Sequence, residues 1–326
     1  MMTEELSDKK LKVSTSPHVH SKKSTEKIMY TVCLALLLPA AAGVYFFGVY
    51  TIFIILSSVI ACILTEYAAK RLRKHEFKMD GSAIITGLLF ALIMPPRIPL
   101  WAVVIGASFS IAIIKEAFGG LGYNIFNPAL AGRAFLSVSF AGMMTRWIAP
   151  VASPFAESVT TATPLNDSFV YAGTKTELYM DLLWGNVGGS LGETSALLIL
   201  IGGIVLLLTG VIKWRIPVIY IGTVFAFTWL IPGEDPILHI LAGGLFLGAF
   251  FMATDYVTAP LTDRGQMLFA LCAGLLVVAI RVYGSLPGGV AFSILIMNAF
   301  TPLIDRYIRP KPYGYVPPEK EDDKDE

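Results

Sequence analysis

The sequence predicts an all-α polytopic membrane protein with about ten transmembrane helices in two inverted five-helix halves, some of the helices broken. The chain is 55% hydrophobic and only 15% charged, with a mean hydropathy of +0.67, so its charges are too few to cover a soluble globule of 326 residues. Apolar segments of about bilayer length recur along it. The basic residues gather in the connections that would share one side of the membrane.

Both ends of the chain are polar. Residues 1–27 hold six lysines among serines and threonines, and no small-residue cleavage site follows the first apolar run. We therefore expect a disordered cytoplasmic tail here and not a cleaved signal peptide. Residues 307–326 end in an acidic run and are expected to form a second cytoplasmic tail. The predicted transmembrane domain is 28–306.

Ten apolar segments lie within this domain. Several are shorter than a full span or are interrupted by glycine and proline, and the third is short enough to be half of a broken pair. In chain order they are 28–48, 50–70, 81–94, 99–116, 128–144, 194–212, 216–232, 236–254, 265–282 and 287–305.

The lysine and arginine distribution predicts the orientation. With a cytoplasmic N-terminus, ten spans place 21 of the 25 basic residues on the inner side, Arg133 among them. Such a bias is typical of cytoplasmic connections. Both termini then lie inside, and the long loop 147–193 lies outside. The four basic residues left on the outer side are Arg97, Arg146, Lys175 and Arg281.

A weak internal repeat favours a division into two halves. Ser82 and Ala83 open a segment that leads to Arg-Ile-Pro at 97–99, and Ser195 and Ala196 open one that leads to Arg-Ile-Pro at 215–217. Five spans per half, an odd number, would invert the second half relative to the first. Chance similarity between apolar segments is the alternative.

Two asparagines mark a glycine-rich approach to the fifth segment. Asn127 precedes Pro128, a pair typical of a helix N-cap followed by the first helical position. The free N–H groups of such a helix end can hold an anion or the carbonyl edge of a flat ring. Asn124 lies three residues earlier in the same approach. A capped turn with no ligand is the alternative.

Acidic residues at membrane depth are further candidates. Asp255 follows the eighth segment, where an ionisable group is costly and therefore a candidate for function. Its alternative is a headgroup-level acid paired with Arg264. Glu193 is expected in the first turn of the sixth segment, where it would compensate the helix dipole. The three cysteines lie in apolar runs without metal-ligand spacing, so we expect packing residues and no metal site.

The outer loop carries a run of threonines at 157–165. Pro164 restricts Thr163 to extended conformations, and the small residues Thr161 and Ala162 leave room for a bulky group near the backbone. Thr163 is therefore a reachable hydroxyl on a shaped turn. A threonine-rich loop without chemistry is the alternative.

Four motifs in order, within 122–128, 157–165, 192–196 and 251–260, resemble the D subunit of the Rnf complex, the membrane-bound ferredoxin:NAD oxidoreductase. The related B subunit of the sodium-pumping NADH:quinone oxidoreductase shares the pattern. The similarity extends over about 28–306, and four separated motifs are far more specific than one.

The resemblance implies a covalent cofactor. In this family a flavin transferase joins FMN through a phosphoester to the last threonine of Asp-x-x-Ser/Thr-Gly/Ser-Ala-Thr, which is Thr163 here. Thr160 and Ala162 match the motif, whereas Glu157 replaces its aspartate and Thr161 its glycine or serine. Neither change should abolish attachment. The resemblance also implies a non-covalent riboflavin inside the helical domain, for which Asn124, Asn127 and the segment around Asp255 are candidate binding residues.

The function we expect is electron relay by a subunit that is inactive alone. The resemblance implies a flavin-bearing G-type subunit, membrane A- and E-type subunits and soluble B- and C-type subunits as partners, and coupling to Na⁺ or H⁺ translocation in a prokaryotic cytoplasmic membrane. The candidate coupling residues are Asp80, Glu116 and Asp255, followed by Glu66 and Asp305. Interfacial ion pairing is the alternative for each of them.

Two other functions compete with this one. A urea- or ammonium-type transporter or channel could use the same inverted fold without a redox cofactor, and a structural scaffold would carry no cofactor at all. Bound flavin separates both from electron relay. The formal net charge of +1 gives no indication of a nucleic-acid partner, because the charges are segregated by position, and the partner surface is lipid.

Overall fold

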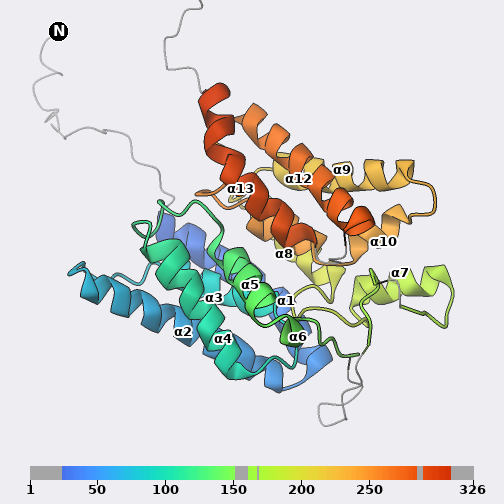
Figure 1. Cartoon of the computed structure of the whole chain (residues 1–326), viewed down its shortest axis with the longest axis horizontal. Helices are drawn as coiled ribbons and strands as arrows, with labels where there is room; N and C mark the ends of the chain where they lie inside the picture. Colours follow the sequence, from blue (N-terminus) through green and yellow to red (C-terminus); the bar gives the residue numbers. More distant parts are fainter. Residues whose placement is uncertain (1–23, 151–160, 167–168, 285–288, 310–326) are drawn as a thin grey trace, which may run out of the picture.

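The computed structural model describes residues 24–150, 161–166, 169–284 and 289–309, and every regular element within these ranges is a helix. Figure 1 shows two groups of helices, one built from the first half of the chain and one from the second. The two predicted tails lie almost wholly outside the described residues, as do Glu157 and Thr160 of the threonine run.

The first group covers the first five predicted segments. Its helices are α1 (Thr25–Phe47), α2 (Tyr50–Leu72), α3 (Ser82–Leu92), α4 (Leu100–Phe109) with the π-helical segment η1 (Ser110–Glu116), α5 (Pro128–Ser139) and the short α6 (Ala141–Met144).

The second group covers the remaining five segments and part of the outer loop. Its helices are α7 (Lys175–Trp184), α8 (Ala196–Leu208), α9 (Arg215–Leu230), α10 (Pro236–Leu241), α11 (Leu245–Leu247) with the π-helical segment η2 (Gly248–Met252), α12 (Asp263–Tyr283) and α13 (Gly289–Tyr307).

Three of the described helices, α1, α2 and α12, are long and apolar enough to cross a membrane by themselves, and α3, α8 and α9 are shorter apolar helices. Several predicted segments are broken. Segment 236–254 is divided into α10, α11 and η2 by a turn in which Gly243 and Gly244 have φ of +70° and +68°. Left-handed conformations favour glycine, so the two adjacent glycines in the sequence account for the break at this position.

The two groups pack by a matching scheme. Helix α2 packs against α3 and α4, and α9 packs against α10 and α12, while α5 and α13 complete their groups against α4 and α12. The groups meet where α1 contacts α8 and where α5 contacts α13. This scheme pairs α2 with α9. The sequence repeat at Ser82 and Ser195 lies instead at the third and sixth segments, so it does not mark equivalent positions of a five-plus-five division.

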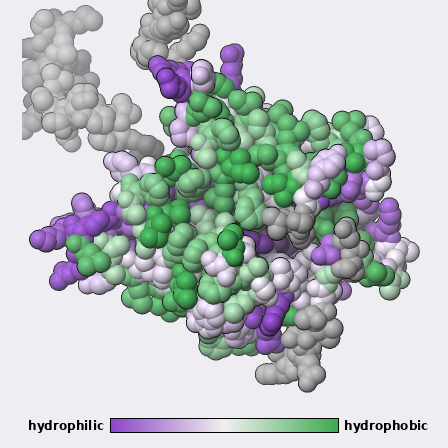
Figure 2. Space-filling view, viewed as in Figure 1, coloured by the Kyte–Doolittle hydropathy of each residue, from purple (hydrophilic) through white to green (hydrophobic). Residues whose placement is uncertain are grey.

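Apolar side chains cover the outside of both groups. Figure 2 shows a hydrophobic surface over most of the helical body, with hydrophilic residues concentrated beyond the ends of helices such as α2 and α13. Leu34, Leu64 and Leu208 are 67%, 60% and 83% exposed. Large exposed apolar residues in such number would be costly in water, whereas a bilayer accepts them.

Candidate functional site

A cavity lies between the two groups of helices and is called the interior cavity. Most of its wall is apolar, with a small set of polar groups, as in many sites for cofactors. Its polar and charged lining residues are Ser82, Thr86, Lys115, Asn124, Asn127, Thr254, Asp255 and Tyr256. The structure therefore brings together Asn124, Asn127 and Asp255, which the sequence analysis named separately.

Asn127 builds one side of this cavity. Its side-chain oxygen accepts hydrogen bonds from the N–H groups of Ala129 and Leu130 at 3.1 and 3.3 Å, and Pro128 is the first helical residue, so the predicted N-cap is confirmed. Its amide also donates to the Met252 carbonyl at 3.4 Å. Asn127 thus joins the start of α5 to the end of η2, across the two halves of the chain.

Asp255 lies three residues beyond the end of η2, in a turn. Its carboxylate accepts from the N–H of Val257 at 3.3 Å and from the hydroxyl of Thr258 at 3.2 Å. Among the described residues no cationic side chain pairs with it, so the expected alternative of a pair with Arg264 is not formed. A partly buried acid without a counter-charge remains a candidate for function.

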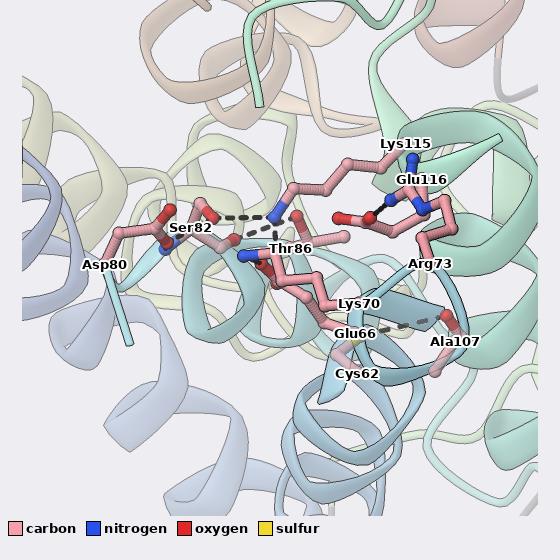
Figure 3. A network of polar contacts seen from close by, with 10 residues as sticks. All are labelled: Cys62, Glu66, Lys70, Arg73, Asp80, Ser82, Thr86, Ala107, Lys115 and Glu116. Carbon is pink, nitrogen blue, oxygen red and sulfur yellow. Dashed lines mark hydrogen bonds and ion pairs between the residues drawn. The ribbon is translucent and has the colours of Figure 1, made fainter. Parts of the chain in front are cut away.

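The opposite charge in the interior cavity comes from Lys115 of η1. Its ammonium donates to Glu66 Oε2 at 2.9 Å and to Ser82 Oγ at 2.6 Å (Figure 3). Glu66 Oε1 accepts from Lys70 at 2.5 Å. Glu66 and Lys115 are 1% and 2% exposed, so this pair is buried within the protein.

Two more predicted coupling residues belong to the same cluster. Asp80 accepts from both the N–H and the hydroxyl of Ser82, at 2.9 and 2.5 Å, and so caps α3. Burial opposes ionisation of Asp80, but the Ser82 hydrogen bonds and the nearby Lys115 and Lys70 hold its pKa below its ordinary value. Glu116 is buried and forms an ion pair with Arg73.

Thr163 lines a second hollow, called the outer cleft. The described loop 161–166 forms one wall, and residues 187–189 and the turn at Gly243 form others. Thr163 itself is half-buried. Other polar lining residues are Arg133, Glu193 and Thr194.

Backbone contacts hold the threonine loop in place. The N–H of Thr161 donates to the Trp147 carbonyl at 3.1 Å, and the Thr163 carbonyl accepts from Asn166 at 2.9 Å. Gly188 lies so close to the loop that a Cβ there would meet the Thr161 methyl at 2.4 Å. The loop therefore rests on a glycine that leaves just enough room for it.

Arg133 supplies the positive charge of the outer cleft. Its guanidinium donates to the Ile93 carbonyl at the end of α3, to Ser190 Oγ at 3.2 Å and to Glu193 Oε1 at 3.5 Å. This corrects one expectation. Glu193 precedes the Ser195 cap of α8, so its partner is Arg133 and not the helix dipole. Arg133, counted with the inner basic residues, contacts a residue of the loop 147–193 that was expected outside, so those two placements do not agree.

Helix α7 anchors the other end of this loop. Leu165 packs in a small apolar cluster with Leu182 and Val187. Tyr171 donates to Asp181 at 2.5 Å, and this hydrogen bond, more than burial, raises the pKa of Tyr171 to about 12. Tyr179 of α7 donates to Asp235, the N-cap residue of α10. Burial opposes ionisation of Asp235, yet the bond from Tyr179 and two backbone N–H groups hold its pKa below its ordinary value.

The part of the chain that the structure describes contains no cluster of three or more His, Cys, Asp or Glu residues that could bind a metal ion. The cysteines lie apart from one another, and Cys62 is buried with its thiol 3.8 Å from the Ala107 carbonyl. His239 lies in α10, and its ring forms a hydrogen bond with Glu234 at 2.7 Å.

Sequence reasoning missed Lys115 and Arg133 as site residues. Both were counted only as inner-side charges, although each lies within a predicted apolar segment, 99–116 and 128–144. A lone cation inside such a segment is the signal that could have found them, because it needs a partner or a cavity.

Comparison with known proteins adds to this geometry. Residues 12–314 match the model of the NQR2, RnfD, RnfE family. The chain is 45% identical over 320 residues to the D subunit of the proton-translocating ferredoxin:NAD(+) oxidoreductase complex of Clostridium ljungdahlii, with 93% of this chain and 96% of that protein covered. It is also 45% identical over 316 residues to the D subunit of the Na(+)-translocating ferredoxin:NAD(+) oxidoreductase complex of Acetobacterium woodii, with 95% and 98% covered.

More distant relatives give the same result. The D subunit of the ion-translocating oxidoreductase complex of Cronobacter sakazakii is 37% identical over 347 residues, with 93% of this chain and 99% of that protein covered. The resemblance to the Rnf protein drawn from the sequence motifs is thereby confirmed, and with it a multi-pass membrane protein. This chain belongs to the NQR2, RnfD, RnfE family.

Proposed function

We propose that this protein is the D subunit of an ion-translocating ferredoxin:NAD oxidoreductase complex and acts as a membrane electron relay, with FMN bound covalently to Thr163. The names and the full-length similarity of the relatives support the complex and the reaction. In this proposal electrons pass through the protein while the complex moves Na⁺ or H⁺, and the protein is inactive alone. The partners are the flavin-bearing G-type, membrane A- and E-type and soluble B- and C-type subunits.

The observation that carries this proposal is the position of Thr163 on the wall of the outer cleft. A phosphoester acceptor needs a hydroxyl that an external transferase can reach, and the half-buried Thr163 lies on a loop at a hollow. The phosphate would keep a negative charge, for which Arg133 is the cation of the same cleft. FMN supplies one- and two-electron redox chemistry when bound, while the protein orients it and tunes its environment.

The interior cavity fits a second flat, mostly apolar group with polar edges. Its wall is mostly apolar and carries a few polar groups, as in many sites for cofactors. Asn124 and Asn127 offer side-chain amides, and Lys115 and Asp255 offer charges. We assign this cavity to the non-covalent riboflavin that the family resemblance implies. Ser82, Asp80 and Glu66 would act indirectly, by holding Lys115.

For the topology we keep ten spans in two inverted five-helix halves, with both termini in the cytoplasm and loop 147–193 outside. The matching packing of α2 with α3 and α4 and of α9 with α10 and α12 supports two halves of one plan. The outer cleft and the interior cavity then lie toward opposite faces of the membrane. Electrons exchanged between them would cross much of its thickness.

In-gel flavin fluorescence of the denatured protein tests the proposal. Wild type, Thr163→Ala and Thr161→Ala are each expressed with a flavin transferase and with the rest of the complex. Denaturation removes non-covalent flavin, so we expect a fluorescent band in wild type and in Thr161→Ala, and none in Thr163→Ala. If wild type has no band while a control substrate of the transferase is labelled, the covalent relay is wrong and a transporter without cofactor becomes the better hypothesis.

A further inference from the structure

We propose that Lys115 is a redox-positioning residue, whose ammonium stabilises the reduced form of the group bound in the interior cavity. This inference rests on the proposed function, because it assumes that a redox group occupies that cavity. It goes further by assigning the charge that sets the reduction potential there. The juxtaposition behind it is a buried cation held by residues of α2 and α3 (Figure 3). This cation lies at the wall of a mostly apolar cavity.

Fold stability is not enough to account for this cluster. Glu66 and Lys115 are almost wholly buried, and burying an ion pair costs desolvation energy that its attraction only repays in good geometry. An apolar pair of the same volume is often as stable. The buried charge of Lys115 is therefore better explained by the cavity that it lines than by a contribution to fold stability.

The hydrogen bonds fix the position of the Lys115 ammonium and leave one of its N–H donors free for a ligand. Its ammonium has three N–H groups, and the described partners are two, Glu66 Oε2 at 2.9 Å and Ser82 Oγ at 2.6 Å. One donor is left for a ligand. The Ser82 hydroxyl donates its hydrogen bond to Asp80, so its oxygen acts as the acceptor for Lys115. The bond to Asp80 also fixes the orientation of this hydroxyl.

Within the cluster Lys115 is the charged residue that lines the cavity, whereas Glu66, Asp80 and Lys70 do not line it. The single carboxylate of Glu66 is shared by Lys70 at 2.5 Å and Lys115 at 2.9 Å, and Lys70 is the partner nearer to solvent. Lys115 and Asp255 are the two charged residues among the described lining of the cavity. A bound group therefore meets one cation on the η1 wall and one anion after η2.

The redox step in question adds one electron to the oxidised group in the cavity. The electron comes from a reduced flavin; no bond forms or breaks, and one negative charge accumulates. An adjacent ammonium in a region of low dielectric favours that charge far more than it would in water. Removing the ammonium should disfavour the reduced form by at least about tenfold, which is about 59 mV for one electron.

The test is a potentiometric titration of the non-covalent flavin in the purified complex. A Thr163→Ala background removes the covalent flavin of this chain, and acid precipitation of a separate sample counts the non-covalent flavin that remains. We expect Lys115→Met to keep the flavin and to lower its potential by about 59 mV or more, and Lys115→Arg to restore it. Glu66→Gln removes a negative charge and should raise the potential.

Two further variants separate charge from structure. The double variant Lys115→Met with Glu66→Gln removes one charge of each sign and should return the potential toward the wild-type value. Lys70→Gln, on the far side of Glu66, should lower it less than Lys115→Met does. Equal potentials in wild type and Lys115→Met, with flavin retained, would overturn the role of Lys115 alone.

Failure of the underlying assignment has a different signature. If acid precipitation releases no non-covalent flavin from the wild-type complex, the cavity holds none and both the assignment and the role of Lys115 are wrong. If Lys115→Met loses the flavin, and Glu66→Gln keeps it with the wild-type potential, Lys115 serves binding alone and the proposal is likewise overturned.

Discussion

The interior cavity and the outer cleft are built in different ways. The interior cavity lies between two groups of helices, and its polar residues are fixed by helix caps and by bonds across the halves, such as that from Asn127 to the Met252 carbonyl. The outer cleft has a loop for a wall, held by a few backbone bonds and by close contact with Gly188. The walls of the interior cavity are therefore helices of the core, whereas one wall of the outer cleft is a surface loop.

This difference explains why a covalent tether would be useful at one place and unnecessary at the other. The interior cavity is the larger of the two and has helices of both halves as walls, so it offers a ligand more contact. The smaller outer cleft offers less contact, and a tether compensates because it makes the local concentration of the group very high. The comparison therefore predicts that changes at the loop affect attachment, whereas changes at the cavity affect retention and potential.

The largest effect is expected from a bulky residue beneath the threonine loop. Gly188→Val should displace the loop, because a Cβ at this position already meets the Thr161 methyl at 2.4 Å and the Ile148 carbonyl at 3.1 Å. We expect at least about a tenfold loss of covalent flavin, as for displaced reacting groups in general. In-gel fluorescence per amount of protein measures it.

The matched control is the neighbouring glycine. A Cβ at Gly189 meets nothing within 4 Å, so Gly189→Ala should keep the wild-type fluorescence. Non-covalent flavin should be unchanged in both variants. Equal labelling of Gly188→Val and Gly189→Ala would mean that the loop position does not control attachment, and the contrast between cleft and cavity would fail.

A second prediction concerns the cation of the outer cleft. Arg133→Gln should lower the free energy of unfolding by about 1–3 kcal/mol, because it leaves the Ile93 carbonyl and the partly buried Glu193 without their donor. Arg146→Gln, at an exposed position before the loop, should change it by less than about 0.5 kcal/mol. Thermal unfolding of the detergent-solubilised complex, followed by tryptophan fluorescence, compares the two.

Arg133→Gln together with Glu193→Gln sharpens this prediction. If the loss in the single variant comes from an unpaired carboxylate, neutralising Glu193 should recover part of it. An equal loss in the single and double variants would assign the effect to the lost bonds at Ile93 and Ser190 instead.

Sequence reasoning located the helices and one wall of each site. Apolar length predicts segments well, and Asn127 with Pro128 is a local signal that fixes a helix start wherever the chain runs. Thr163 was likewise predicted to lie on a turn within a long loop, from Pro164 and its small neighbours. These features are determined by residues that are close together in the sequence, so sequence patterns predict them.

What sequence reasoning could not give is the set of long-range pairs. Lys115 meets Glu66 across 49 positions and Ser82 across 33, and Arg133 meets Glu193 across 60. The π-helical turn η1 also shifts Lys115 relative to a regular helix, so helical periodicity does not predict the direction of its side chain. Glu193 was misplaced for a smaller reason, since α8 begins two residues later than expected.

A third prediction tests the cap at the interior cavity. Asn127→Ala removes the acceptor for two N–H groups and the donor to Met252, and should cost about 0.5–2 kcal/mol of stability together with much of the non-covalent flavin. Asn127→Asp keeps the cap but not the donor. It should recover most of the stability and little of the flavin.

Thermal unfolding and acid-released flavin measure the two quantities separately. Covalent fluorescence at Thr163 should stay at the wild-type level in both variants. If Asn127→Ala instead lowers covalent labelling as strongly as it lowers non-covalent flavin, the two regions are one folding unit and the comparison between them breaks.

The smallest effect is expected from the phenol that holds α7 to the outer loop. Tyr171 donates to Asp181, and its pKa is raised to about 12 by that hydrogen bond first and by burial and nearby acids second. A raised pKa means that the bond is fully present below the ordinary value of about 10 and is lost as the pH rises through about 12. The tyrosinate absorbance of wild type minus Tyr171→Phe should therefore rise late, and in Asp181→Asn it should rise closer to pH 10 because the negative acceptor is gone. A wild-type difference curve centred near the ordinary pKa would show that the Tyr171 bond is absent in solution, and the outer region would then be held by Leu165 and its apolar neighbours alone.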